Sequence, residues 1–240
     1  MRAEYENQLI FFCMFFSAHI FSFYLFILQP SSIFGRSFCC ARATACLKSH
    51  IRLPGISEIL PSLYLCGAGV AIPVFLEKLG ITCVINAAPE LPETPLPLID
   101  GSKPVYLQVP VLDKSDIDIS NYFDEVSDLI EQIRQTNGKT MVHCVAGVSR
   151  SASLVLAYLM KYWKMSLKGA FELVRTARPQ IRPNIGFVRQ LIFYEEKLFQ
   201  KVTVTMVFKE SLGCEIPDIY EMEYQALEIF YHKHRHLKLR

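Results

Sequence analysis

The sequence predicts an α/β fold in which a central, mostly parallel sheet is flanked by helices. Strand-like and helical segments alternate over residues 55–200, and this alternation is typical of parallel sheets with crossover helices. Within that region, residues 140–160 combine an apolar strand, a glycine-containing loop and a strong helix. Such a unit aims backbone N–H groups and a helix N-terminus at an anion. The folded domain is therefore expected to bind an anion at this loop.

Short apolar runs mark the predicted strands, and their lengths suit a buried sheet. They lie at residues 59–64, 81–86, 105–111 and 140–143. A helix is predicted over residues 70–79 and is expected to stop at Gly80, because glycine accepts the left-handed conformation that ends helices.

Further helices are predicted from capping residues and from apolar residues at helical spacing. They are a helix from Ser120 or Asn121 to Asn137-Gly138, a helix over residues 151–162, and two helices that follow caps at Ser166 and Asn184.

Residues 201–240 are predicted to form a C-terminal extension. Apolar and polar residues alternate over 202–208, which indicates a strand-like segment at an edge. The last nine residues, 232–240, carry three alternate histidines among Lys and Arg. This pattern is compatible with a weak zinc or nickel site or with anionic lipid, but a solvated basic tail is the favoured interpretation.

The most informative motif is the run from His143 to Ser151, which reads His-Cys-Val-Ala-Gly-Val-Ser-Arg-Ser. Cys144 and Arg150 are separated by five residues. At this spacing a short loop can wrap its N–H groups around phosphate oxygens, while the arginine adds bidentate hydrogen bonds. Cys46 and Arg52 have the same spacing, but no glycine lies between them and no strand precedes them. We therefore treat that second pair as a coincidence.

The residue types around this motif suit a thiolate nucleophile. Loop amides, the helix N-terminus and Arg150 all favour the thiolate of Cys144 by lowering its pKa. His143 is expected to orient the loop and support the thiolate, Gly147 to let the backbone bend, and Ser151 to donate a hydrogen bond to the sulfur. The predicted phosphate-binding residues are Val145, Ala146, Gly147, Val148, Ser149 and Arg150. No metal or cofactor is expected, because the arginine and the amides supply the positive field.

Hydrolysis of a phosphoester also needs an acid that protonates the leaving oxygen. The polar segment after the strand at 105–111 offers three carboxylates, Asp113, Asp116 and Asp118. Residue chemistry alone leaves the choice among them open, because a carboxylate on a surface loop is more often solvated or a helix cap.

The run VHCVAGVSRSASLVLAYLMKY resembles the signature of dual-specificity protein phosphatases, within the cysteine-dependent tyrosine phosphatase superfamily. The resemblance extends over residues 56–225 and includes ILPSLYLCG, GITCVINAA, VPVLD, ARPQIRPNIGFVRQL and IPDIYE. It is strongest to the small atypical group without an N-terminal kinase-docking domain, for which residues 1–54 leave no room.

This resemblance implies a role for each matching residue. Cys144 is implied to be the nucleophile, Arg150 to bind phosphate and Ser151 to assist breakdown of a phosphocysteine. The general acid maps onto Asp113, with Asp116 and Asp118 as alternatives. Asn184 matches an asparagine after Arg-Pro, for which a structural role near the loop is expected. The implied substrates are phosphorylated proteins that carry phosphotyrosine, phosphoserine or phosphothreonine.

Other functions of such a loop are less well supported by the sequence. A phosphoinositide phosphatase would favour lysine within the loop, whereas Val145, Ala146 and Val148 are neutral. An RNA triphosphatase would need a basic approach surface, and no nucleic-acid partner is expected. A catalytically silent phosphate-binding module would be expected to lack the cysteine, the arginine or the acid.

Residues 1–54 are predicted to be an N-terminal extension with a linker over 30–54. Residues 9–28 contain no charged residue, and this segment is long enough for a membrane-spanning helix. The basic residues after it favour a cytoplasmic location for its C-terminal side. A cleaved signal peptide and a segment absent from the working protein are the alternatives. Cys39 and Cys40 follow the apolar run and are candidates for acylation, although two ordinary thiols are favoured.

The eight cysteines are not expected to form disulfides, because their spacing shows no compact framework. A nucleophilic thiolate needs a reducing compartment, so the catalytic domain is expected in the cytosol, with membrane anchoring through residues 9–28. The net charge of +2 favours no class of partner.

Overall fold

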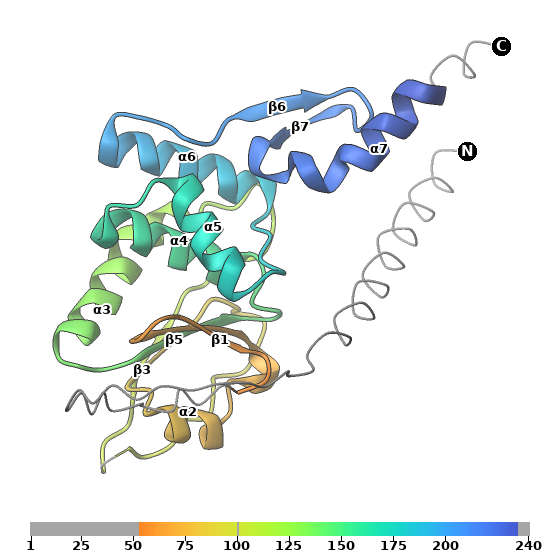
Figure 1. Ribbon diagram of the computed structural model, residues 1–240. Coiled ribbons are helices and arrows are strands. Elements are labelled where there is room, and N and C mark those ends of the chain that lie inside the picture. Colours follow the sequence, from red (N-terminus) through yellow and green to blue (C-terminus); the bar gives the residue numbers. More distant parts are fainter. Residues whose placement is uncertain (1–52, 100, 235–240) are drawn as a thin grey trace, which may run out of the picture. The chain divides into compact units, whose positions relative to one another are not determined.

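The computed structural model describes residues 53–99 and 101–234 (Figure 1). The predictions for residues 9–28, for Cys39 and Cys40 and for the end of the basic tail lie outside these residues. Among the residues described, none of the helices combines the length and apolar character needed to cross a membrane.

The fold is built on a five-stranded sheet, in the order β1-β2-β5-β3-β4. The strands are β1 (Ile56–Leu60), β2 (Leu63–Gly67), β3 (Cys83–Asn86), β4 (Val105–Gln108) and β5 (Thr140–Cys144). The pairings β2–β5, β5–β3 and β3–β4 are parallel, and only β1 pairs in the antiparallel sense. The predicted α/β fold with a mostly parallel sheet is therefore confirmed.

Two predicted strands have different limits in the structure. The prediction of one strand over 59–64 is wrong, because the chain turns at Pro61 and Ser62 and forms the hairpin of β1 and β2. Proline has no N–H to continue a ladder, so it favours this break. The strand predicted over 105–111 ends at Gln108, two residues before Pro110.

Helices cover both faces of the sheet (Figure 1). They are α2 (Pro73–Leu79), α3 (Phe123–Gln135), α4 (Arg150–Trp163), α5 (Leu167–Ala177) and α6 (Ile185–Phe199). Helix α2 lies on one face, and α3 to α6 lie on the other. The predicted stop at Gly80 is confirmed by its left-handed φ of 67°. The predicted start of α2 at residue 70 is wrong, because Pro73 occupies the first turn.

The capping predictions are confirmed for two helices and wrong for a third. Ser166 accepts a 3.1 Å hydrogen bond from the Gly169 N–H, and Asn184 accepts one of 2.9 Å from the Phe187 N–H. Helix α3, however, has Tyr122 at its N-cap position, after a 3₁₀ turn over Ser120–Tyr122. Asp118 caps that turn instead, by accepting 2.9 Å from the Ser120 N–H.

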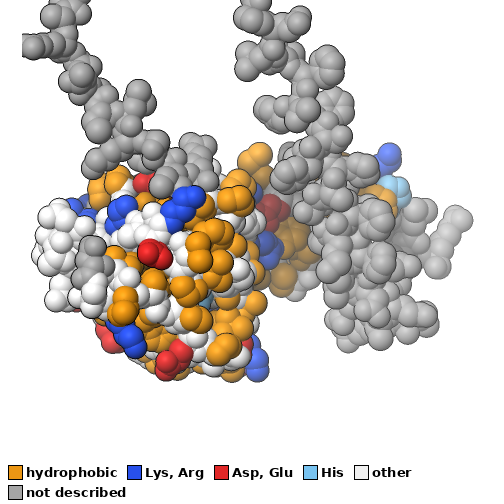
Figure 2. All heavy atoms as spheres, turned by 90° about the horizontal axis from the view of Figure 1, so that it is seen from below, with side chains coloured by type: hydrophobic (Ala, Val, Ile, Leu, Met, Phe, Trp, Pro, Cys, Tyr) orange, Lys and Arg blue, Asp and Glu red, His pale blue; other side chains and the backbone are white. Residues whose placement is uncertain are grey.

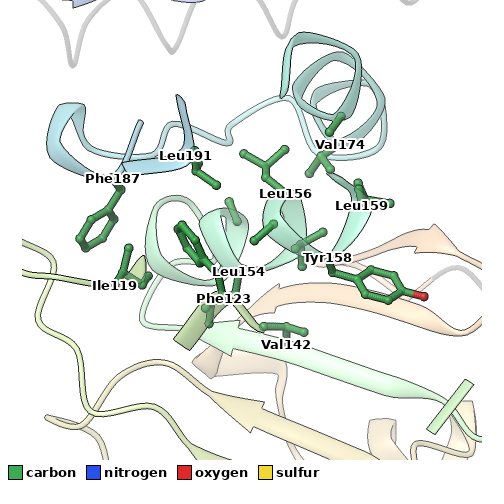
Figure 3. Close-up of a cluster of buried hydrophobic side chains, with 14 of the residues drawn as sticks. Ile119, Phe123, Val142, Leu154, Leu156, Tyr158, Leu159, Val174, Phe187 and Leu191 are labelled. Carbon is green, nitrogen blue, oxygen red and sulfur yellow. The ribbon is translucent and has the colours of Figure 1, made fainter. Parts of the chain in front are cut away.

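Alternation along the strands divides the core into two layers. The larger layer lies between the sheet and α3 to α6, and Figure 3 shows part of it, with Phe123 and Leu154 beside Val142 of β5. The smaller layer lies under α2 and includes Met141, the neighbour of Val142 on the same strand. On the face shown in Figure 2, hydrophobic side chains are interspersed with charged ones. Burial on both faces fixes the register of β5 and thus the position of Cys144.

The C-terminal extension is more ordered than predicted. It contains a hairpin of β6 (Met206–Lys209) and β7 (Cys214–Pro217), a 3₁₀ turn over Asp218–Tyr220, and helix α7 (Glu221–His234). The strand-like prediction for 202–208 is confirmed only from Met206 on. Helix α7 was not predicted, and two of the three alternate histidines lie in its last turn.

Candidate active site

Cys144 is the last residue of β5, and α4 begins six residues later at Arg150. Its side chain is buried, and its Sγ accepts hydrogen bonds from the Gly147 N–H at 3.3 Å and from the Ser151 hydroxyl at 3.2 Å. Burial alone would raise the pKa of this thiol, but the Ser151 hydroxyl and the N–H groups of Ser151, Val148 and Gly147 outweigh burial and lower the pKa. Cys144 is thus suited to be a thiolate.

The carbonyl oxygens of residues 145–149, within the Cys–Arg loop (residues 144–150), are all held by donors outside the loop. The pairs are Val145 with the Ala68 N–H at 3.0 Å, Ala146 with Arg178 Nη2 at 2.9 Å, Gly147 with Arg178 Nε at 2.7 Å, Val148 with the Arg182 N–H at 2.9 Å, and Ser149 with the Ser153 N–H at 2.9 Å. In a planar trans peptide, the N–H of the next residue points the opposite way. The N–H groups of this loop therefore converge on its centre, where an anion would lie.

Gly147 is the residue that allows this curvature. Its φ of 67° lies in the left-handed region, which other L-residues rarely adopt. A Cβ at this position would also collide with the Cys66 carbonyl and press on the Arg178 guanidinium. Both constraints admit only glycine.

Arg150 is buried, and one of its donors makes no hydrogen bond. Its Nη1 donates to Glu90 Oε2 at 2.8 Å and to the Val111 carbonyl at 3.2 Å, while Nη2 lies 2.7 Å from Glu90 Oε1. Its Nε is buried and makes no hydrogen bond. Since an unpaired buried N–H of a charged group is costly, this donor is well placed to bind an oxyanion.

Asp113 lies at the mouth of the Cys–Arg loop. Its Oδ1 accepts hydrogen bonds from the Ser149 hydroxyl at 2.7 Å and from Asn184 Nδ2 at 2.8 Å, and its Oδ2 lies 3.8 Å from Arg150 Nε. Asp118 instead caps the turn before α3, and Asp116 is exposed. Among the three carboxylates left open by the sequence, the geometry brings Asp113 to the loop.

His143 contacts the loop backbone rather than the sulfur. Its Nδ1 lies 3.4 Å from the carbonyl oxygen of Cys144, and its Nε2 lies 2.8 Å from the Thr94 hydroxyl. Burial lowers the pKa of this imidazole, which favours the neutral ring. These contacts fit the expected orienting role, exerted through the Cys144 carbonyl group.

Known proteins are similar to this chain. A family model described as dual specificity phosphatase, catalytic domain, matches residues 63–197. Dual specificity protein phosphatase 14 of Bos taurus is 45% identical over 176 residues, which are 73% of this chain and 85% of that protein. The chain belongs to the dual-specificity phosphatase family.

Further comparisons agree with this membership. Dual specificity protein phosphatase 18 of Homo sapiens is 44% identical over 174 residues, which are 72% of this chain and 89% of that protein. The crystal structure of human DUSP28 matches with a TM-score of 0.55 at 34% identity, over 61% of this chain and 97% of that chain. The predicted resemblance and fold are thereby confirmed.

The protein is a dual-specificity protein phosphatase of the cysteine-dependent superfamily, and phosphorylated proteins are its class of substrate. The predicted enzyme class is confirmed. The family match at residues 63–197 lies inside the limits of 55–200 predicted for the catalytic domain, and those limits stay a prediction.

Three residues of this phosphatase site were not found from the sequence. Glu90 follows β3, whose carboxyl end lies beside that of β5 in the parallel sheet, and this shared edge was the available signal. Arg178 lies within the quoted run ARPQIRPN, but nothing local indicates that it reaches back to the loop. Thr94 lies in an irregular segment and carries no signal of its contact with His143.

Proposed function

We propose that this phosphatase acts through a phosphocysteine intermediate on Cys144. One observation carries the proposal: the Cys–Arg loop donates to the Cys144 sulfur from the Gly147 N–H and to Asp113 from the Ser149 hydroxyl, and the Nε of Arg150, which makes no hydrogen bond, lies 3.8 Å from Asp113 Oδ2. The converging N–H groups and Arg150 bind the phosphate dianion and stabilise the charge of its equatorial oxygens.

In the first step, the Cys144 thiolate attacks phosphorus in line with the leaving oxygen. The S–P bond forms as the P–O bond of the phosphoester breaks, and Asp113 transfers its proton to the departing Tyr, Ser or Thr oxygen. The Ser149 and Asn184 donors hold Asp113 in place for this transfer. The dephosphorylated protein then leaves.

In the second step, water attacks the phosphocysteine. Asp113, now a carboxylate, accepts a proton from the water while the new P–O bond forms and the S–P bond breaks. Ser151 donates to the departing thiolate, as its 3.2 Å contact with Sγ allows. Inorganic phosphate is released and the thiolate is restored.

We further propose that the catalytic domain works in the reducing cytosol, because oxidation would remove the thiolate. The uncharged segment at residues 9–28 supports anchoring of the chain to a membrane. Alkaline extraction of cell membranes tests the anchor: the full chain should stay with the membranes, and a chain lacking residues 9–28 should not. Release of both chains would contradict anchoring.

Phosphate release from matched phosphotyrosine and phosphothreonine peptides tests the catalytic proposal. The full chain should hydrolyse both peptides. Cys144→Ser should abolish turnover, and Asp113→Asn should slow it by roughly 10²-fold. A Cys144→Ser variant that retains turnover would overturn the assignment of the nucleophile.

Asp116→Asn is the matched control for the acid, because Asp116 is an exposed carboxylate on the same segment. Its turnover should equal that of wild type. Equal losses in Asp113→Asn and Asp116→Asn would contradict the assignment of Asp113.

A further inference from the structure

The segment that joins α5 to α6 contacts both the Cys–Arg loop and Asp113. The Arg182 N–H donates 2.9 Å to the Val148 carbonyl of the Cys–Arg loop. Two residues later, the Asn184 N–H donates 3.1 Å to the Ser149 hydroxyl, and Asn184 Nδ2 donates 2.8 Å to Asp113. Residues 182–184, here called the strap, therefore set the positions of a loop peptide and of the general acid together.

The strap has no regular secondary structure of its own. Helix α5 ends at Ala177 and α6 begins at Ile185, so no continuous ladder of backbone hydrogen bonds fixes the residues between them. Asn184 is held as the N-cap of α6, whereas Arg182 and Pro183 also contact side chains of the C-terminal extension.

Tyr220 is the buried part of that support. Its ring is fully buried, and its hydroxyl donates 2.8 Å to the carbonyl of Pro183 at the middle of the strap. The guanidinium carbon of Arg182 lies 5.0 Å from the centre of the same ring, within the range of a cation–π contact. One aromatic side chain thus contacts two consecutive strap residues.

Glu223 is the charged part of that support. Its carboxylate accepts 3.0 Å from Arg182 Nε and lies 3.3 Å from Nη2 of Arg175 near the end of α5. The Tyr224 hydroxyl accepts a further hydrogen bond from Arg182. Three side chains of the C-terminal extension, Tyr220, Glu223 and Tyr224, therefore hold the Arg182 guanidinium.

We propose that Tyr220 and Glu223 are positioning residues for the phosphatase reaction, acting through the strap on the Cys–Arg loop and on Asp113. The inference rests on the proposed roles of Cys144 and Asp113. A displacement of the strap moves one N–H of the phosphate site and the acid at once, and small misplacements of reacting groups cost large factors in rate. The C-terminal extension thereby belongs to the machinery of the enzyme.

The test compares Tyr220→Phe and Glu223→Gln with Glu215→Gln in the full chain. Glu215 is the matched control, because it joins the same extension to α6 through an exposed 2.8 Å pair with Arg189 and does not contact the strap. Initial rates are measured at 20 °C with aryl phosphates of graded leaving-group pKa, and thermal unfolding is recorded for each variant.

Tyr220→Phe and Glu223→Gln should each lower kcat about fivefold, with the largest loss for the poorest leaving group, because a displaced Asp113 protonates it less well. Glu215→Gln should match wild type at every leaving group. A double-mutant cycle adds Arg182→Gln, in whose background Glu223→Gln should have no further effect on kcat.

Two outcomes would overturn the inference. One is a lower unfolding temperature with unchanged kcat and unchanged dependence on the leaving group, since a merely structural role predicts that result. The other is additivity of Glu223→Gln and Arg182→Gln. Failure of the proposed mechanism would give a different result, namely a Cys144→Ser variant that still turns over substrate.

Discussion

The guanidinium of Arg178 donates a 2.7 Å hydrogen bond from Nε to the carbonyl oxygen of Gly147, a residue 31 positions earlier in the chain. Its Nη2 also donates 2.9 Å to Ala146, and its Nη1 donates 3.0 Å to Gly55. One buried side chain thus fixes the orientation of two carbonyl groups of the Cys–Arg loop. The arginine proposed to bind phosphate, Arg150, and the arginine that holds the loop carbonyls, Arg178, are different residues.

Arg178→Lys should lower kcat/KM by roughly 10²-fold, because an ammonium cannot reproduce the planar fork that holds two adjacent carbonyls. Steady-state kinetics on a phosphotyrosine peptide checks this result. Arg189→Lys, at an exposed pair with Glu215, is the control and should match wild type. A fully active Arg178→Lys variant would show that the loop keeps its shape without the fork.

Gly147→Ala should both destabilise the fold and abolish turnover, since a Cβ meets the Cys66 carbonyl and the left-handed φ is strained. We expect a loss of roughly 2–4 kcal/mol in the free energy of unfolding, measured by urea denaturation. Gly69→Ala, where a Cβ meets nothing within 4 Å, is the matched control and should be nearly neutral. Similar losses in both variants would contradict this account of Gly147.

Ser151→Ala should shift the reactivity of Cys144 to higher pH. The Ser151 hydroxyl is one of the donors that lower the pKa of the thiol, so its removal raises that pKa and moves thiolate formation to higher pH. The rate of alkylation by iodoacetamide as a function of pH measures the change. An unchanged pH profile would show that the backbone N–H groups alone control the thiolate.

The same variant should also slow the second chemical step. Without the donor to the departing sulfur, kcat should fall roughly tenfold, and a burst of dephosphorylated peptide should precede the steady state. Rapid-quench kinetics detects that burst. Loss of activity without a burst would place the effect of Ser151 in the first step.

Glu131 should make the fold sensitive to acid. Two hydrogen bonds from Arg134, at 2.7 and 2.8 Å, oppose the effect of burial and hold the pKa of this carboxyl at about 2. Because the folded pKa lies below the unfolded value of about 4.3, the carboxylate stabilises the fold above about pH 4.3. That contribution is lost as the pH falls toward 2.

The free energy of unfolding from urea titrations at pH 7 and pH 3 checks this sign. Glu131→Gln should reduce the difference between the two pH values relative to wild type. Glu77→Gln, an exposed glutamate on α2, should leave the difference unchanged. A Glu131→Gln variant with the wild-type difference would contradict the linkage.

The local part of the site could be predicted from the sequence, because Cys144, Gly147, Arg150 and Ser151 lie within one strand–loop–helix unit. Glu90 could not, since its pairing with Arg150 spans 60 residues and depends on β3 lying beside β5. Residue chemistry left the candidate acid open among three carboxylates and the family resemblance pointed to Asp113, but only the folded loop shows that Asp113 contacts Ser149 and Asn184.

The same division holds for the fold. Helices with a single apolar stripe and a clear cap, such as those after Ser166 and Asn184, were predicted closely. Helix α7 was missed: it buries none of its residues fully, and Met222, Ile229 and Phe230 remain exposed on it. A helix whose apolar residues are not gathered on one buried face carries a weak periodic signal.

The most direct test of the central claim is to trap the covalent intermediate. A ³²P-labelled phosphotyrosine peptide is mixed with the full chain, quenched in acid within milliseconds, and the labelled protein is digested and mapped. The account predicts label on the peptide that contains Cys144, more of it in Ser151→Ala, and none in Cys144→Ser. Label on another residue, or phosphate release with no labelled protein in either active variant, would contradict it.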